Sequence, residues 1–149
     1  MVDNSKAGAV TRRSRRDLVC SHGNRGEVTL AVTVSGRHRQ MVVAEVAGEI
    51  DLRTAETLRT RLLGLAEAGF GQIVVDFAQV RFCDATGLGA LVAVRNRLRE
   101  RGGDLRLARV RPAQRRIFHI TGLDRLFALH DSVEGAVRQA QGSATSPLR

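Results

Sequence analysis

The sequence contains few aromatic residues and no long apolar run. Aromatic side chains make up 3% of the 149 residues, and Trp and Tyr are absent, so aliphatic side chains must pack the core. The hydrophobic content of 43% is sufficient for one ordinary globular domain. No apolar run reaches the roughly 20 residues of a membrane-spanning helix, and the polar N-terminus lacks the apolar stretch of a secretory signal. These absences predict a cytoplasmic protein that does not interact with a membrane.

Patterns typical of metal, redox and nucleotide sites are also missing. The two cysteines, Cys20 and Cys83, are far apart and form no C-x-x-C pair, and the four histidines lack ligand spacing. Gly87 and Gly89 do not extend to a G-x-G-x-x-G loop, because Val92 occupies the position of the last glycine. We therefore expect two free thiols, no metal and no bound cofactor.

The net charge of +9 leaves a nucleic-acid-binding protein as one alternative interpretation. Lys and Arg bind phosphates best when they cluster on one surface. Here some of the basic residues fall within residues 1–27, together with acidic ones, and the other arginines are spread over several expected elements. A solvated basic surface is the favoured interpretation, and no direct contact with nucleic acid is expected.

The two ends of the chain differ in composition from its middle. Residues 1–26 show neither a strand period nor a helix period, which predicts a disordered basic extension, and 142–149 have the composition of a flexible tail. The first regular elements are alternating apolar segments at 27–34 and 41–48. They predict an antiparallel hairpin, joined by a turn over 35–40.

The remaining pattern alternates between short apolar runs and helical spacing. It predicts strands at 71–78, 104–110 and 124–129, and helices at 55–68, 86–101, 111–121 and 131–141. Thr54 is a candidate helix cap, Pro112 a helix start, and Asp131 with Glu134 a capping box. Because strands and helices alternate through short connections, we expect one α/β domain over 27–141, with a mixed, mainly parallel sheet and about four helices.

The segment RFCDATGLGALVAV (81–94) passes from an apolar approach through D-A-T-G into an expected helix. In a purely structural interpretation Thr86 is the N-cap of that helix, and Asp84 favours its positive end. Gly87 and Gly89 lower helix propensity by up to about 1 kcal/mol each relative to Ala, but they leave the hydroxyl open to approach. No His, Lys or Glu adjoins Thr86 to activate it, so the segment favours a docking or modification site over an enzyme.

A second polar segment, GEIDLRTAET (48–57), lies where an expected strand meets an expected helix. Glu49 and Asp51 would complement the helix dipole there. In a parallel sheet this segment and the loop at 82–87 both leave the carboxyl ends of strands, the edge where α/β sheets usually carry function. The two acidic loops would then share one face.

Together these segments resemble bacterial anti-sigma factor antagonists of the STAS-domain family. The resemblance rests on G-E-I-D at 48–51, D-A-T-G-L-G at 84–89 and GGDLRLARVRPAQRRIFHITGLDRLF at 102–127, and it extends over roughly 28–141. Proteins of this family bind an anti-sigma factor that is also an ATP-dependent serine/threonine kinase, and so release a sigma factor. The kinase phosphorylates the hydroxyl residue of D-x-[ST]-G, which abolishes binding, and a phosphatase reverses the modification.

Carried over by position, the resemblance implies phosphorylation of Thr86 and a docking surface around it. The implied partner contacts are Glu49, Asp51, Arg53, Thr54, Asp84, Ala85, Gly87, Leu88 and Gly89. ATP would be bound by the partner and not by this chain, and a monomer is sufficient. The simplest family members carry Ser at the acceptor position, so Thr86 departs from them.

Two consequences of the resemblance are open to test. We expect the phosphate to block the interface by desolvation and by repulsion from Asp84, Glu49 and Asp51, with little change of fold. The alternative within the same fold is a STAS scaffold in a sensory complex that works without this phospho-switch.

Overall fold

Five strands form one mixed sheet whose order in space follows the order in the chain. The computed structural model describes the backbone of residues 30–145 and the side chains of residues 30–141. The strands are β1 (Leu30–His38), β2 (Met41–Ile50), β3 (Gln72–Cys83), β4 (Asp104–Ala108) and β5 (Ala128–His130). β1 runs antiparallel to β2, and all the other neighbours are parallel. The predicted fold class, an N-terminal hairpin on a mainly parallel sheet, is confirmed.

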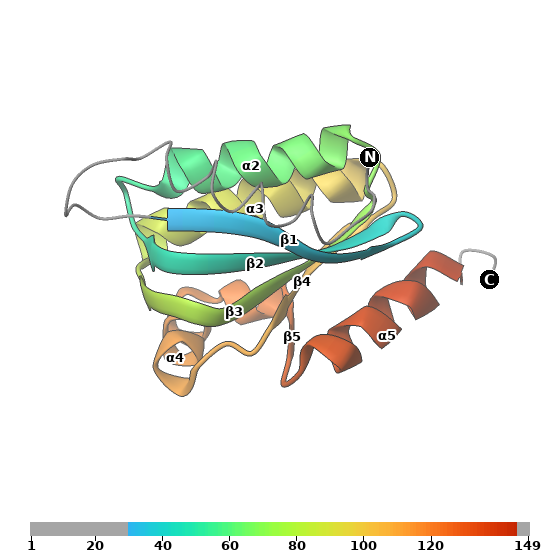
Figure 1. The fold of residues 1–149 in the computed structure, drawn as a ribbon. Coiled ribbons are helices and arrows are strands. Elements are labelled where there is room, and N and C mark those ends of the chain that lie inside the picture. The colour runs from blue at the N-terminus through green and yellow to red at the C-terminus, as the bar shows by residue number, and fades with distance from the viewer. Residues whose placement is uncertain (1–29, 146–149) are drawn as a thin grey trace.

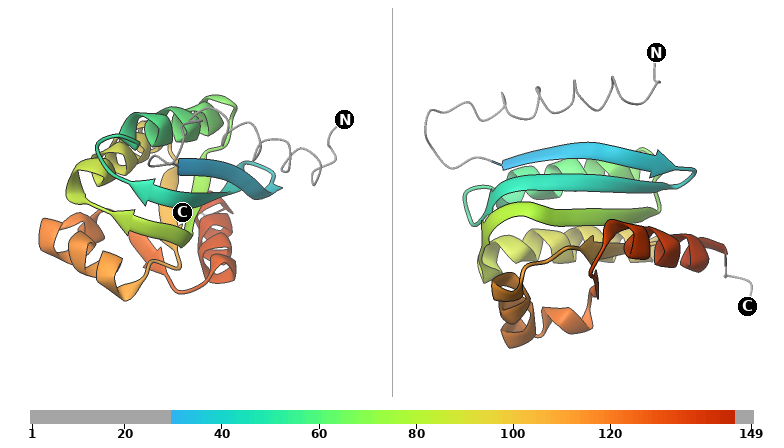
Figure 2. Two further views of the ribbon diagram at one scale, coloured as in Figure 1. Left: turned by 60° about the vertical axis from the view of Figure 1, so that its left-hand side comes forward. Right: turned by 60° about the horizontal axis from the view of Figure 1, so that its bottom comes forward.

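Helices connect the parallel strands and cover both faces of the sheet. They are α2 (Ala55–Glu67), α3 (Ala85–Glu100), α4 (Pro112–Thr121) and α5 (Val133–Thr145), with a 3-10 turn at Leu123–Arg125. α2 and α3 pack side by side on one face, whereas α5 packs on the other (Figure 1). The two rotated views in Figure 2 show the same arrangement of layers. None of the helices within residues 30–145 has the length and apolar character of a membrane span.

The alternation of side chains along β3 divides the core into two parts. Ile73, Val75 and Phe77 belong to the large cluster under α2 and α3, and Phe118 of α4 packs against Phe77 at the margin of that cluster. Val74 points to the opposite face, into a smaller cluster with Met41, Val43, Ala108, Ala136 and Ala140. Successive side chains of a strand point to opposite faces of the sheet. A strand that is covered on both faces therefore carries apolar residues at successive positions, as the Val/Ile run of β3 does.

The hairpin differs from its prediction at the turn. β1 continues to His38, with an irregularity between Val34 and Gly36, so the connection is reduced to Arg39 and Gln40. Arg39 has a φ of 57°, in the left-handed region that a tight turn requires. The polar composition of 35–40 concealed the strand extension, since an exposed edge strand is also polar.

Several other element ends were predicted incorrectly. β3 extends well beyond residue 78, and the expected strand at 124–129 begins within the 3-10 turn and is a strand only from Ala128, where the short β5 starts. α5 is capped by Ser132, whose Oγ accepts from the Gly135 amide at 3.0 Å, while Asp131 binds Arg115 instead. α5 also continues to Thr145, past the expected boundary at 141. The expectations for residues 1–29, including Cys20, and for 146–149 lie outside the described residues.

Candidate functional site

The loops that follow β2 and β3 lie side by side at one edge of the sheet. The strands are paired up to Ile50 and Cys83, and just beyond them the Asp84 amide donates to the Ile50 carbonyl at 3.1 Å. Parallel pairing therefore brings the segment after β2 next to the start of α3, as expected from the sequence. We call this edge, formed by residues 49–54 and 82–89, the loop edge.

Gly87 allows the start of α3 to approach the loop after β2. A Cβ atom at Gly87 would lie 2.7 Å from the Ile50 Cγ2 atom and 2.8 Å from the Asp51 amide nitrogen. Contacts this short are repulsive, so any larger residue would push the two segments apart. A Cβ at Gly89 would meet nothing within 4 Å. Only the first of the two glycines is therefore a packing requirement, and Gly89 is exposed and faces open space.

Asp84, and not Thr86, caps α3. Its carboxylate accepts a hydrogen bond from the Gly87 amide at 2.8 Å, and its extended backbone is typical of an N-cap residue. The structural interpretation of Thr86 as the cap is therefore wrong. Thr86 is the second residue of the helix; it is exposed, and its hydroxyl has no hydrogen-bond partner among the described residues.

The loop after β2 is held by hydrogen bonds among its own residues. The Thr54 hydroxyl donates to the Glu49 carbonyl at 2.8 Å and accepts from the Asp51 amide at 3.0 Å. The Asp51 carboxylate accepts from the Arg53 amide at 2.9 Å and from the Arg53 guanidinium at 3.0 Å. Thr54 thus occupies the N-cap position of α2 without capping it, contrary to its predicted role. Both side chains are buried, so they shape the loop and do not face a partner.

Arginines accompany two of the three carboxylates at the loop edge. Asp51 pairs with Arg53, and the Glu49 carboxylate lies 3.7 Å from the Arg81 guanidinium. Burial of Asp51 acts to raise its pKa, but the hydrogen bonds and the charge of Arg53 outweigh this effect, and the net pKa lies below its ordinary value. The two acidic loops therefore lie at one edge, but two of their three carboxylates are paired with arginines, so the edge is a mixed-charge surface in which acidic residues remain in excess.

The sequence-derived contact residues divide into exposed and buried groups. Arg53, Ala85, Thr86 and Gly89 are exposed, whereas Asp51, Thr54, Gly87 and Leu88 are buried. Glu49 and Asp84 are intermediate. The buried members can support the shape of the loop edge, but they offer little surface for contact.

Two exposed apolar side chains at the loop edge escaped the sequence analysis. Leu52 is 72% exposed and Phe82 is 49% exposed, although both are large hydrophobic residues. Phe82 stands opposite Glu49 in the register of β2 and β3. The signal was available: Leu52 interrupts the polar segment after β2, and Phe82 falls near the end of a strand beside the D-A-T-G motif. Large apolar side chains left in water are typical of a contact site.

The cysteine at the loop edge is not a reactive thiol. Cys83 is a buried free thiol, and burial, with a smaller effect from the Asp84 charge, raises its pKa to about 11. A thiol with so high a pKa is almost entirely protonated at neutral pH and is a poor nucleophile. The Thr86 hydroxyl, in contrast, belongs to an exposed residue.

The described arginines are distributed over several helices and strands, and eight of the seventeen within residues 30–141 lie within ion-pair distance of a carboxylate. Those within ion-pair distance of Asp or Glu are Arg53, Arg59, Arg81, Arg97, Arg99, Arg101, Arg109 and Arg115. A nucleic-acid-binding surface requires a cluster of arginines that are free to contact phosphates, because this contact releases the counterions of the nucleic acid. Within residues 30–141 the pattern therefore favours a solvated surface over a nucleic-acid interface.

Comparisons with known proteins agree with this geometry. The family model of the STAS domain matches residues 30–136. The anti-sigma-B factor antagonist of Bacillus subtilis (strain 168) is 34% identical over 97 residues, which are 65% of this chain and 88% of that protein. The crystal structure of an anti-sigma factor antagonist from Mycobacterium paratuberculosis superposes with a TM-score of 0.66 at 29% identity, over 77% of this chain and 95% of that one.

A further solved structure shows the same fold in a modified state. The phosphorylated form of the Bacillus cell fate determinant SpoIIAA superposes with a TM-score of 0.58 at 23% identity, over 73% of this chain and 98% of that one. The order of the strands, the packing of the helices and the match to the family model point to the same family. This chain belongs to the STAS domain family.

Proposed function

We propose that this protein is an anti-sigma factor antagonist, a regulator without enzymatic activity. It binds an anti-sigma factor that has serine/threonine kinase activity and so releases a sigma factor. The relatives that support this proposal include the B. subtilis antagonist, which is similar over nearly its whole length. The exposed Thr86 hydroxyl on the first turn of α3 is the observation on which the proposal depends most.

The docking surface in this proposal is the exposed part of the loop edge. Leu52 and Phe82 would supply apolar contact, Arg53 a polar contact at its margin, and Gly89 an open approach to Thr86. Interfaces commonly gain most of their affinity from a few large apolar or aromatic side chains surrounded by polar ones. The buried residues Asp51, Thr54, Gly87 and Leu88 would contribute indirectly, by holding this surface in shape.

Phosphorylation of Thr86 would switch this surface off without unfolding the domain. A phosphate adds about −1.5 to −2 charge at pH 7. At a helix N-terminus such a charge is favourable by roughly 0.3–1 kcal/mol, so α3 should remain folded. Burying the same charge in an interface without a cationic partner costs several kcal/mol, whereas a tenfold loss of affinity needs only about 1.4 kcal/mol.

Desolvation would be the larger part of this block. Because Glu49 and Asp51 have arginine partners, the repulsion that they exert on a phosphate is smaller than the sequence suggested. Asp84 is the carboxylate that remains next to Thr86 without an arginine partner in the described residues. A phosphatase that acts on phosphorylated Thr86 would restore binding.

The test is incubation with a candidate kinase-type anti-sigma factor and ATP, followed by intact-mass and fragment spectrometry. We expect one phosphate on Thr86, none on Thr86→Ala, and unchanged modification of the control Thr60→Ala, which removes an exposed hydroxyl from α2. Thr86→Ala should still bind the partner, whereas Thr86→Glu should bind at least about tenfold more weakly. A phosphate on another residue, or a tight complex that is never phosphorylated, would contradict the switch and favour an unswitched scaffold.

A second arm of the experiment tests the docking surface itself. Phe82→Ala should weaken binding of the anti-sigma factor by about tenfold, because a half-exposed aromatic ring loses its contact area. The matched control is Ile120→Ala, since Ile120 is 73% exposed and lies on α4, outside the residues that form the loop edge. Equal losses for the two variants would show that the loop edge is not the interface.

A further inference from the structure

Arg53 is an exposed arginine that Asp51 holds at the loop edge. Its side chain is 68% exposed, yet its guanidinium Nη2 atom donates to the Asp51 carboxylate at 3.0 Å. Its backbone amide donates to the same carboxylate at 2.9 Å. Both the backbone and the tip of Arg53 are therefore bound to one acceptor. Among the described residues the guanidinium makes this one hydrogen bond, so most of its five N–H donors remain available.

Thr86 lies close to Asp51 as well, because the start of α3 packs against the loop after β2. A Cβ atom at Gly87 would lie 2.8 Å from the Asp51 amide nitrogen, so the backbone of Gly87 contacts that loop. Thr86 immediately precedes Gly87, and consecutive Cα atoms are about 3.8 Å apart. Arg53 and Thr86 are thus exposed residues in the immediate surroundings of Asp51.

A phosphate on Thr86 would be added to a surface that already carries negative charge. Asp84 lies two residues before Thr86 and caps the same helix, and it has no arginine partner in the described residues. The Asp51 carboxylate is close to Thr86 too, and Arg53 is its arginine partner. Like charges at short range oppose full ionisation of a phosphate and raise its pKa. An arginine with free donors beside Asp51 would offset this repulsion.

We propose that Arg53 binds the phosphate of phosphorylated Thr86 within the same chain while it keeps its contact with Asp51. This proposal rests on the proposed function, since it concerns the modified state of the same site. Arginine binds phosphate through paired, charge-assisted hydrogen bonds, which are among the strongest polar contacts in proteins. One guanidinium does not neutralise a phosphate, Asp51 and Asp84 together, so the loop edge stays negative and binding stays blocked. Arg53 is also withdrawn from the docking surface.

The test uses the full chain with phosphothreonine incorporated at position 86 during synthesis, so that no kinase is required. A pH titration of the ³¹P NMR signal gives the second pKa of the phosphate, whose ordinary value is about 6. We expect Arg53→Gln to raise this pKa by about 0.5 or more, because the dianion loses its cation. Arg53→Lys keeps the charge but not the planar pair of donors, and it should give an intermediate value.

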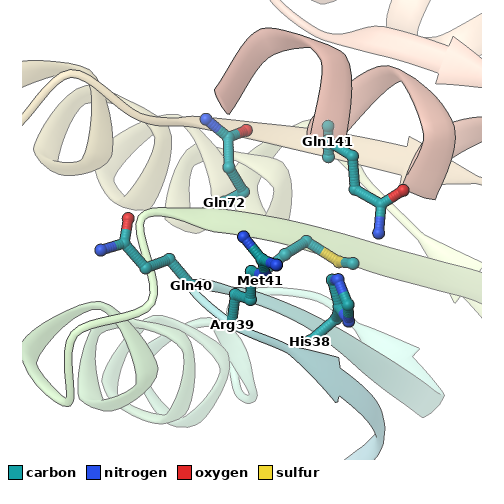
Figure 3. Close-up of a pocket in the computed structure, with 7 residues that line it drawn as sticks. His38, Arg39, Gln40, Met41, Gln72 and Gln141 are labelled. Atoms are coloured by element: carbon teal, nitrogen blue, oxygen red, sulfur yellow. The ribbon is translucent and has the colours of Figure 1, made fainter. Parts of the chain in front are cut away.

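Two other arginines serve as controls. Arg39 lies in the turn between β1 and β2, beside the cavity that Figure 3 shows at the opposite end of the strands. The ten residues of β2 separate it from the loop edge by about 30 Å, several times the screening length at physiological salt. Arg39→Asn tolerates the positive φ and should change the pKa of the phosphate by less than about 0.1. Arg81→Gln, which removes the partner of Glu49, should raise this pKa less than Arg53→Gln does.

An equal pKa of the phosphate in the Arg53→Gln chain and the parent chain would overturn the proposal. A larger rise in Arg81→Gln would assign the phosphate to another arginine, and an equal rise in Arg39→Asn would indicate only the net positive charge. Thermal unfolding establishes that each variant is folded before the titrations are compared. Because the phosphate is incorporated without a kinase, the titration decides the role of Arg53 whether or not an anti-sigma factor phosphorylates Thr86. Failure of this proposal and failure of the proposed function are therefore distinguishable.

Discussion

The two ends of strands β2 and β3 treat their buried polar groups in opposite ways. At the loop edge Asp51, Thr54 and Asp84 direct their hydrogen bonds inward, so every one of them supports the backbone. At the other end Gln72 is equally buried but its carbonyl oxygen is unsatisfied. Buried polar groups that are satisfied internally hold a surface in shape, whereas an unsatisfied one lowers the stability of the fold. The loop edge is thus held by its own hydrogen bonds, whereas the end of the strands that carries Gln72 is not.

The largest effect expected from this contrast concerns the close packing at Gly87. Gly87→Ala should lower the free energy of unfolding by about 1–3 kcal/mol, because the new methyl group would overlap Ile50 and the Asp51 amide. Gly89→Ala should raise it by up to about 1 kcal/mol, since its methyl group meets open space and Ala favours the helix. Urea denaturation of the two variants measures the difference. Equal stabilities would show that the two loops are not held together at Gly87.

The next effect concerns the internal hydrogen bonds of Asp51. Asp51→Ala should cost about 1–3 kcal/mol, because the Arg53 and Thr54 amides lose their acceptor in a buried loop. Asp51→Asn retains an acceptor oxygen and should cost less. Chemical denaturation at pH 7 gives both values, and a loss below about 0.5 kcal/mol for Asp51→Ala would mean that the loop does not depend on this carboxylate.

The same carboxylate should make stability depend on pH. The pKa of Asp51 is depressed in the folded state, so its contribution is complete above the unfolded pKa of about 4 and is lost as the pH falls through the lower folded value. Glu56 and Glu67 also have lowered pKa values through their arginine partners, so the wild-type profile is a sum. Asp51→Asn isolates one part of that sum. Its stability should fall less steeply than that of the wild type below pH of about 4.

A smaller effect distinguishes the cap of α3 from its exposed hydroxyl. Asp84→Ala should lower the free energy of unfolding by about 0.5–2 kcal/mol, as expected for the loss of an N-cap. Thr86→Ala should change it by less than about 0.5 kcal/mol, because the Thr86 hydroxyl makes no hydrogen bond in the described structure. Thermal unfolding at neutral pH is adequate for the comparison. The reverse order of losses would restore Thr86 as the cap.

The sequence predicted the elements better than it predicted their ends. The alternation of apolar residues identified the hairpin, a short Val/Ile run identified β3, and Pro112 identified the first residue of α4. The D-A-T-G motif contains two good capping residues, and local rules do not choose between them. The choice depends on where β3 ends, which is fixed by the hydrogen bond from the Asp84 amide to Ile50 in another strand.

The candidate site was only partly predictable for a related reason. Sequence spacing brought the segments after β2 and β3 to one edge, and the parallel pairing confirms that placement. It did not reveal that Asp51 and Thr54 turn inward while Leu52 and Phe82 remain in water. Exposure is a property of the packed structure, and a period-2 or helical pattern carries no information about residues in loops or at strand ends.

The smallest expected effect returns to the end of the strands that carries Gln72. Gln72→Met should raise the free energy of unfolding by about 1 kcal/mol, because a buried unsatisfied oxygen is replaced by an apolar group of similar length. The control Gln79→Met, on the exposed face of the same strand, should change stability by less than about 0.5 kcal/mol. A loss of stability in Gln72→Met would instead mean that the amide already has a partner within the chain, and the contrast between the two ends would fail.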